Sequence, residues 1–274
     1  MHPPSARDLI RPLCAFACLA LIVASGDLIV RGASPTMRYY FERAEFALHP
    51  SAAQACAFGA SHLNVNDPDD HDIDRAEYFY RQCAALDPRY PLVYHQLARI
   101  DFLRGNFRAA IAEIDQDIAL EGDTNPHAYY VRGLIEGYQS KYADAADDFA
   151  RFLQFDPAVW AGYNDESWVL MKAGKYTEAR DVLVKGLAQF PTNAWLLNSY
   201  AIALFELGDK AKAATVAAQA EEAVMKLTPE DWLHADPGND PAIAADGLGT
   251  FQQAALTNLE KIKSVPGTAA VTRE

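Results

Sequence analysis

The sequence predicts an all-α protein, a solenoid of antiparallel helix hairpins, because three kinds of position recur every 34 or 35 residues. A large residue is followed by a turn residue, and the turn residue by a small one, always at the same spacing. The large residues are Tyr94, Tyr129, Tyr163 and Leu197. The turn residues are Gly105, Ser140, Gly174 and Gly208. The small residues are Ala110, Ala145, Ala179 and Ala213.

The recurring alanines mark where two antiparallel helices cross, since the helices approach closely only where a side chain is small. Large residues on the same faces then fill the space between successive hairpins. These residues are Leu97, Ile111, Ile114, Phe149, Leu153, Leu183 and Leu187. One hairpin cannot bury its apolar faces alone, so stacking predicts a right-handed superhelix with local contacts.

Composition supports a folded chain and argues against some partners. Half of the 274 residues are apolar, which allows a sizeable core. The 24 Lys and Arg against 37 Asp and Glu give a net charge of −13, which disfavours long-range attraction to nucleic acid or anionic lipid. The sequence has no basic patch that would offset this charge, so we expect no nucleic-acid partner.

The N-terminal segment, residues 1–34, has the pattern of a targeting segment. Arg7 and Arg11 precede an apolar run over residues 13–30. This run is about long enough for a short membrane helix. It is also typical of a signal peptide cleaved near Ser25, the alternative interpretation. Either interpretation places the body of the protein in the periplasm, as a single-pass inner-membrane protein or as a cleaved, secreted one.

A lead-in helix is predicted over residues 35–50, with Tyr39, Phe46 and Ala47 available for burial. About five hairpins follow over residues 51–225. The first of them is degenerate, with helices expected over residues 51–63 and 74–86.

The loop inside this first hairpin is rich in aspartate, which suggests two hypotheses. Its carboxylates could bind calcium, but the loop lacks the glycine and distal glutamate of an EF-hand. Alternatively, Asp74 caps the next helix and Glu77 completes a capping box. The sequence favours the cap, and we predict no metal site. The loop aspartates are Asp67, Asp69, Asp70, Asp72 and Asp74.

The four cysteines fall into two pairs. Cys14 and Cys18 lie inside the apolar run, without a lipid-attachment pattern. Cys56 and Cys83 fall on facing helices of the first hairpin. They form either a disulfide, which an oxidising compartment permits, or two small buried residues in a helix interface.

The C-terminal part, residues 226–264, loses the period and is expected to cap the stack. Thr228 is a candidate helix cap, with Pro229 in the first turn. Residues 242–264 are predicted to be mostly helical, interrupted at Gly247 and Gly249, with an apolar stripe. The stripe comprises Phe251, Leu256, Leu259 and Ile262. Residues 265–274 are expected to form a disordered tail.

The chain lacks the common motifs of enzymes and cofactor proteins. It has no nucleotide-binding glycine loop, nucleophile elbow, HExxH motif or paired CxxC ligands. We therefore expect no catalytic residues and no cofactor. A weaker hypothesis places an enzymatic site around Trp232, His234 and Asp236.

The repeat resembles the tetratricopeptide repeat over about residues 91–225, with its aromatic, glycine, alanine and proline positions. A fifth, degenerate copy covers about residues 51–90. Arg132, Glu166 and Asp101 occupy positions where the family usually has a core leucine or aromatic residue. These departures affect the expected local packing, not the expected fold.

The resemblance implies that the first helix of each hairpin lines an inner groove. The implied groove residues are His95, Arg99, Tyr130, Tyr138, Asn164, Trp168, Lys172, Trp195, Asn198 and Phe205. Asn164 and Asn198 stand one repeat apart and could hold the backbone of an extended peptide. Tyr130, Trp168 and Trp195 would add apolar contact. Alternatively, the two tryptophans pack between repeats.

These observations predict a non-enzymatic adaptor that faces the periplasm and binds a peptide or protein partner in an envelope-associated complex. The alternative is a permanent accessory subunit of a membrane enzyme, such as envelope polysaccharide machinery. The Lys/Asn/Arg set with which family members bind a C-terminal carboxylate is not reproduced. The identity of the partner and the oligomeric state stay open.

Overall fold

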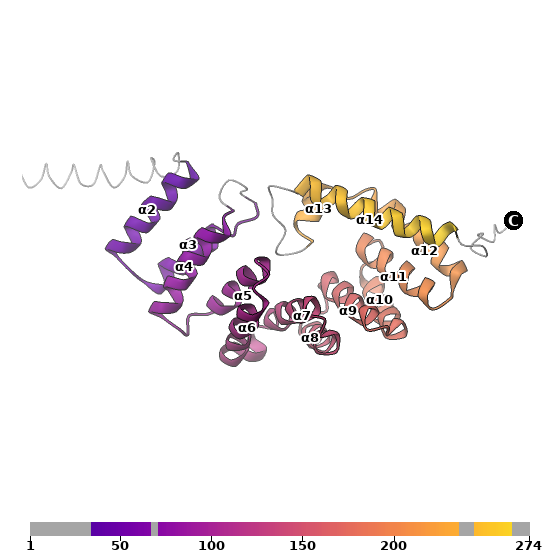
Figure 1. The fold of residues 1–274 in the computed structure, drawn as a ribbon, viewed down its shortest axis with the longest axis horizontal. Coiled ribbons are helices and arrows are strands. Elements are labelled where there is room, and N and C mark those ends of the chain that lie inside the picture. Colours follow the sequence, from indigo (N-terminus) through magenta and orange to yellow (C-terminus); the bar gives the residue numbers. More distant parts are fainter. Residues whose placement is uncertain (1–33, 67–70, 236–243, 265–274) are drawn as a thin grey trace, which may run out of the picture.

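The computed structural model describes residues 34–66, 71–235 and 244–264, and all regular elements in these residues are helical (Figure 1). The helices are α2 (Pro35–Leu48), α3 (Ala52–Ser61), α4 (Ile73–Leu86), α5 (Val93–Leu103), α6 (Phe107–Glu121), η1 (Gly122–Thr124), α7 (His127–Tyr138), α8 (Tyr142–Phe155), α9 (Trp160–Lys172), α10 (Tyr176–Gln189), α11 (Ala194–Glu206), α12 (Lys210–Val224), α13 (Pro229–Leu233) and α14 (Ala244–Ser264). An all-α solenoid is therefore confirmed.

Some predictions fall outside the described residues. These are the targeting segment over residues 1–33, the loop residues 67–70, Asp236 and the tail over residues 265–274. Among the helices that the structure describes, none is long and apolar enough to cross a membrane.

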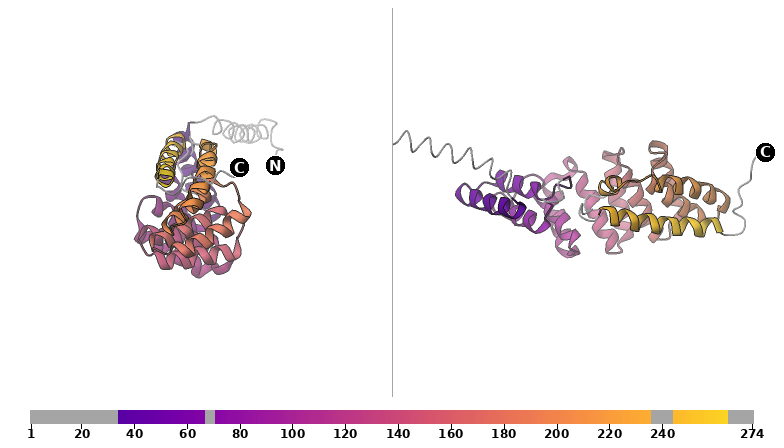
Figure 2. Two further views of the ribbon diagram at one scale, coloured as in Figure 1. Left: turned by 90° about the vertical axis from the view of Figure 1, so that its right-hand side faces the viewer. Right: turned by 90° about the horizontal axis from the view of Figure 1, so that it is seen from above.

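The hairpins stack in chain order along the long axis of the molecule (Figure 2). Contacts between successive first helices, α5 with α7, α7 with α9 and α9 with α11, are more extensive than contacts between successive second helices. The first helices therefore form the inner side of the curve. The two ends of the solenoid rise on this same side (Figure 1).

The four recurring turn positions share one backbone conformation. Their φ angles are positive, at 73° for Gly105, 62° for Ser140, 74° for Gly174 and 82° for Gly208. In each turn, the N–H of the following residue donates to a carbonyl five residues earlier, as Lys141 does to Glu136 at 2.9 Å. This bond closes the first helix and redirects the chain into the second. Glycine suits the left-handed conformation, and Ser140 adopts it with a side chain.

The crossing positions are closely packed, as the alanine pattern predicts. Ala110, Ala145, Ala179 and Ala213 are all fully buried. Phe149 and Leu183 fill the adjacent space and are also fully buried. The hydrophobic core therefore continues from hairpin to hairpin.

Ion pairs account for two of the departures from the apolar repeat pattern, the half-buried Arg132 and the buried Asp101. Arg132 pairs through Nε with Oδ2 of Asp148 at 2.6 Å and through Nη1 with Oδ1 of Asp115 at 3.0 Å. Arg81 of α4 pairs through Nη2 with Oδ2 of Asp101 at 3.0 Å, and it also pairs with Glu113. Charged groups inside the stack are thus compensated by partners on neighbouring helices.

Glu166 is the third departure, and it lacks such a close cation. Burial raises the pKa of its carboxyl group to about 7, and the more distant Lys185 offsets this only in part. The charged form of Glu166 is therefore disfavoured in the folded protein.

Helix α2 covers the N-terminal end of the stack with one face. Phe46 is buried and Tyr39 is half-buried, as predicted, but Ala47 is exposed because it lies about 100° around the helix from Phe46, on the flank of the packed face. Glu42 on the buried face contacts His62, with Oε2 and Nε2 2.7 Å apart. This polar contact, inside an aromatic environment, ties α2 to the end of α3.

The first hairpin differs from the prediction at its cap. Asp72, not Asp74, caps α4, and its Oδ1 accepts from the backbone N–H groups of Asp74 and Arg75. The Asp74 side chain instead pairs with Arg104 of the next hairpin.

Cys56 of α3 and Cys83 of α4 form a disulfide, with their Cα atoms 5.4 Å apart. The sequence allowed either a disulfide or two small buried residues here, and the structure contains the disulfide. The bond joins the two helices of the first hairpin across their buried interface.

The C-terminal helices cover the other end of the stack. Thr228 caps α13 as expected, in a capping box with Asp231. The predicted interruption of α14 is wrong, because the helix runs through both glycines. A Cβ atom on Gly247 would lie 2.2 Å from the Trp232 ring, so glycine here lets α13 pack against α14.

Candidate partner-binding surface

The inner side of the solenoid carries a continuous row of aromatic side chains that crosses three hairpins. Phe102 of α5 contacts Tyr138 of α7 with ring centroids 5.3 Å apart, and Tyr138 contacts Trp168 of α9 at 5.5 Å. Phe107 contacts both Phe102 and Tyr138. We call Phe102, Phe107, Tyr138 and Trp168 the aromatic row. Tyr138 is 60% exposed, so the middle of the row is open to a partner.

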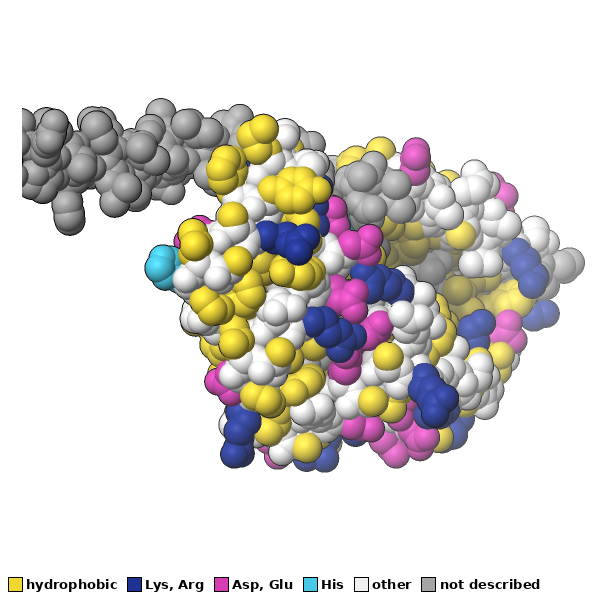
Figure 3. All heavy atoms as spheres, turned by 60° about the vertical axis from the view of Figure 1, so that its left-hand side comes forward, with side chains coloured by type: hydrophobic (Ala, Val, Ile, Leu, Met, Phe, Trp, Pro, Cys, Tyr) yellow, Lys and Arg dark blue, Asp and Glu magenta, His cyan; other side chains and the backbone are white. Residues whose placement is uncertain are grey.

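Figure 3 looks at the molecule with its N-terminal end forward and shows a hollow behind that end. Hydrophobic side chains are visible inside the hollow, between the N-terminal helices and the C-terminal part. Apolar groups in a concave surface favour the burial of a partner's side chains.

Two residues predicted to line the groove are instead part of the interior. Tyr130 is only 5% exposed, and its ring packs against Phe149 and Phe152. His95 is buried as well, and its Nδ1 lies 3.4 Å from Nδ2 of Asn125. Burial and, to a lesser extent, Arg99 lower the pKa of His95 to about 3, so its ring is neutral. These side chains support the groove from behind.

Asn164 also has a different role from the predicted peptide clamp. Its Oδ1 accepts from Oγ of Ser199 at 2.9 Å, and its Nδ2 donates to Oδ1 of Asp165 at 3.1 Å. Asp165 in turn accepts from the hydroxyl of Tyr130 at 2.6 Å. We call Tyr130, Asp165, Asn164 and Ser199 the polar ladder, because together they join α7, α9 and α11. The ladder fixes the inner surface and leaves little of Asn164 for a peptide.

Asn198, the second predicted clamp, is not an equivalent of Asn164 in the structure. Its Oδ1 is buried and has no hydrogen-bond partner among the described residues. The two amides therefore do not present matching groups to one extended backbone.

Trp195 is covered by the C-terminal helix. Its ring stacks between Trp160 of α9, with centroids 4.8 Å apart, and Phe251 of α14, at 5.3 Å. Helix α14 packs on both α11 and α12, so it reaches the inner side of the last hairpin as well as the end of the stack. Both faces of the Trp195 ring are thus already occupied within the chain.

The remaining predicted residues keep polar or partly apolar surface near the groove. Lys172 is exposed at the end of α9, and Phe205 is half-buried in α11. Arg99 is half-buried, and its Nη1 donates to Oε1 of Gln96 at 2.8 Å.

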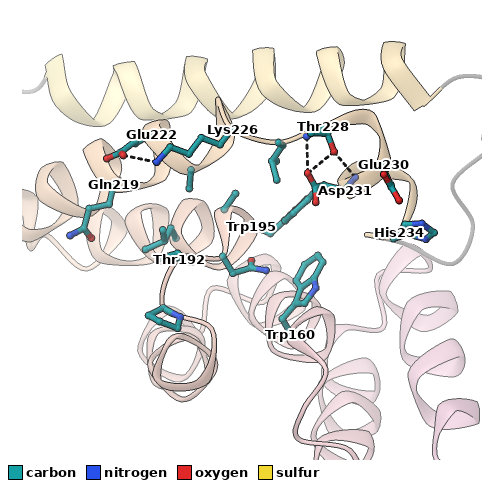
Figure 4. Close-up of a pocket in the computed structure, with 16 residues that line it drawn as sticks. Trp160, Thr192, Trp195, Gln219, Glu222, Lys226, Thr228, Glu230, Asp231 and His234 are labelled. Atoms are coloured by element: carbon teal, nitrogen blue, oxygen red, sulfur yellow. Dashed lines mark hydrogen bonds and ion pairs between the residues drawn. The ribbon is translucent and has the colours of Figure 1, made fainter.

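A pocket of about 860 Å³ lies where α9, α11, α12 and α13 meet (Figure 4). Trp160 and Trp195 form its aromatic wall, and Figure 4 shows Trp160 pointing from α9 towards the residues of α13. The polar lining includes Glu222, Lys226, Glu230, Asp231 and His234. Trp160 was missed in the sequence because it precedes the repeating large position, although its aromatic type was a signal.

The pocket has an acidic polar side whose groups are held in place. Lys226 pairs with Glu222 at 2.7 Å. The side chain of Thr228 and its backbone N–H both donate to Asp231, which keeps the pKa of that carboxyl below its usual range. Asp231 is therefore ionised at neutral pH. An aromatic wall beside carboxylates suits a cationic group.

The described residues offer little support for a catalytic or metal site. No group of three or more His, Cys, Asp or Glu side chains in this part of the chain is arranged to hold a metal ion. In the C-terminal region proposed for an enzymatic site, Trp232 packs against Gly247, and His234 lies at the pocket rim.

The fold defines the class of protein as an α-solenoid of helix hairpins, and the comparisons give its type. Residues 170–229 match the tetratricopeptide repeat family. A crystal structure of a tetratricopeptide repeat protein from Parabacteroides merdae superposes with a TM-score of 0.59 at 15% identity, covering 91% of this chain and 93% of that chain.

A crystal structure of the protein MamA is similar as well, with a TM-score of 0.55 at 19% identity over 64% of this chain and 92% of that chain. At such identities the likeness concerns the fold, which is that of a tetratricopeptide-repeat solenoid. None of the curated proteins compared with the chain matches its sequence significantly.

Proposed function

We propose that the protein is a non-catalytic scaffold that binds an extended peptide or protein segment along the inner side of its solenoid. The observation that carries this proposal is the aromatic row, which stays partly exposed across three hairpins instead of being buried between them. Rigid aromatic side chains bury large areas at low entropic cost, as partner-binding surfaces require.

The bound segment would run from the aromatic row to the tryptophan pocket. Trp168 and Trp160 lie eight residues apart on α9, which corresponds to about 12 Å along the helix axis. Four residues of an extended peptide cover this distance. The carboxylates of the pocket would then receive a basic side chain of the segment, stacked on Trp160.

We also propose that this scaffold faces the periplasm and belongs to an envelope-associated complex. The apolar run over residues 13–30 with arginines before it supports export. The Cys56–Cys83 disulfide supports an oxidising compartment. The mass of the mature chain tests the anchored form, because a chain that begins at Gly26 would exclude it.

Photocrosslinking in intact cells tests the partner-binding surface. Benzoylphenylalanine replaces Tyr138 in one variant and Phe155 in a matched control, since Phe155 is 47% exposed on the second helix α8. We expect a protein adduct from position 138 that is absent from position 155. Tyr138→Ala should then reduce copurification of the same protein without lowering the thermal midpoint. Equal adducts at both positions, or none at 138, would contradict the proposal.

A permanent subunit of a membrane enzyme is distinguished by its stoichiometry. Such a subunit would copurify with its partner at a constant ratio in mild detergent, whereas an adaptor for a peptide segment would be recovered largely alone after dilution.

A further inference from the structure

Helix α2 is apolar on two opposite faces, and the solenoid covers only one of them. Its inner face, with Tyr39, Glu42 and Phe46, packs on α3 and α4. At 100° per residue, Met37, Phe41, Ala44 and Leu48 share the opposite side of the helix. We call these four residues, with Tyr40 at their edge, the outer stripe.

The outer stripe is well exposed to solvent. Met37 is 52% exposed, Phe41 43%, Leu48 74% and Tyr40 62%. Four of the large hydrophobic side chains that are exposed in the described residues thus lie on this one helix. Figure 3, in which the N-terminal end faces forward, shows hydrophobic side chains gathered over that end. Isolated exposed apolar residues are ordinary, but a stripe along one helix indicates a contact surface.

From this stripe we infer that α2 lies on the surface of a lipid bilayer, with Met37, Phe41 and Leu48 in the interfacial region. The inference rests on the membrane-anchored form of the proposed function, but not on partner binding. An amphipathic helix binds such a surface through its buried apolar area. Here the solenoid takes the place of the polar face.

The position of α2 in the chain favours lipid as the occupant. The apolar run ends at Val30 and α2 begins at Pro35. Five residues span at most about 18 Å, so α2 stays close to the end of the run. If that run enters a bilayer, the outer stripe lies within reach of the same bilayer.

A second copy of the chain fits the stripe less well. Four side chains, each exposing about half of roughly 200 Å², offer about 400 Å². A stable specific interface buries about 800 Å² on each partner. The stripe alone is therefore too small for a stable dimer.

The charges on α2 agree with an apolar contact. Arg38 and Arg43 balance Glu42 and Glu45 on this helix. Moreover, Arg43 lies over the Tyr78 ring at 4.5 Å, and Glu45 accepts from Gln54 at 2.8 Å. Since the helix has no net charge, its attraction to lipid should not depend on anionic headgroups and should change little with salt.

Lipid photocrosslinking on the full-length chain tests this inference. The chain is reconstituted into phosphatidylcholine vesicles with benzoylphenylalanine at position 37, 41 or 48. The control position is Thr36, which is exposed next to Met37 but accepts from Nη2 of Arg75 and so faces α4. We expect lipid adducts at 37, 41 and 48 at several times the yield at 36, and equal yields at low and high salt.

Each other result overturns the inference. A chain that does not float with the vesicles refutes both the membrane location and the lipid contact. If it floats but gives no lipid adduct at the outer stripe, or gives a crosslink to a second copy instead, the lipid contact alone is refuted. The double variant Phe41→Asp, Leu48→Asp adds a second measurement. On vesicles, hydrogen exchange of α2 should be faster in this variant than in the wild type, whereas exchange of the other helices should be the same in both.

Discussion

Removal of the Cys56–Cys83 disulfide should loosen the N-terminal end of the solenoid and leave the rest unchanged. The two cysteines are 27 residues apart in sequence. Closing a loop of this length stabilises the folded state by about 3.5 kcal/mol through the entropy of the unfolded chain. Because the first hairpin packs mainly on α2 and α5, little of this loss can be shared with later hairpins.

Hydrogen exchange measured by mass spectrometry checks this prediction in the Cys56→Ala, Cys83→Ala double variant. A change of 3.5 kcal/mol corresponds to an increase of about 400-fold in the opening equilibrium. We expect faster exchange of this order in α3 and α4, and unchanged exchange in α11 and α12. Substitution is preferable to a reductant, which would have to reach a bond between two buried cysteines.

A matched variant, Cys14→Ala with Cys18→Ala, keeps the disulfide and should exchange like the wild type in α3 and α4. If the disulfide variant shows wild-type exchange in these two helices, the reasoning is refuted. Uniformly faster exchange over all hairpins would refute its second part, the local character of the hairpin contacts.

Two further predictions concern single positions in the stack. Ser140→Gly should raise the free energy of unfolding measured in urea by up to about 1 kcal/mol, because Ser140 holds a φ of 62°. The reverse change at an equivalent turn, Gly174→Ser, should lower the free energy of unfolding. A less stable Ser140→Gly variant would contradict the argument that Ser140 is strained. Burial raises the pKa of Glu166 to about 7 from an ordinary value of 4.5, so its unfolded carboxyl ionises first and stability falls as pH rises between these values. Glu166→Gln should lack this part of the fall in urea titrations from pH 4 to pH 8, and identical pH profiles would contradict it.

The repeating part of the fold could be predicted from sequence because every hairpin has the same local requirements for its turn and for its helix crossing. The turn at Gly105 needs a positive φ, and the crossing at Ala110 needs a small side chain. Each requirement favours one residue type at a fixed position of the repeat, and this regularity is visible in the sequence. Ser140 shows the limit of such a rule, because the same turn forms there without glycine.

The candidate site was predicted less well, because its exposed surface depends on contacts between repeats. Tyr130 occupies a position that the family pattern assigns to the groove, but the carboxylate of Asp165 one hairpin later holds its hydroxyl inside. Trp195 is covered by Phe251 of α14, a helix outside the period whose register the repeat pattern does not determine. The pattern gives helix faces, whereas these pairings set which side chains remain open.

The ion pairs of Arg81 and Arg132 have a consequence for how the solenoid could evolve or be engineered. Arg81 reaches acids on α5 and α6, and Arg132 reaches one acid on α6 and another on α8. Each cation therefore requires particular neighbours, unlike the interchangeable alanine and leucine contacts around it. Exchanging the first two hairpins would leave the buried acids Asp101 and Glu113 without their counter-charge Arg81, at a cost of several kcal/mol. The order of the hairpins is thus encoded by charge, although their shape is repeated.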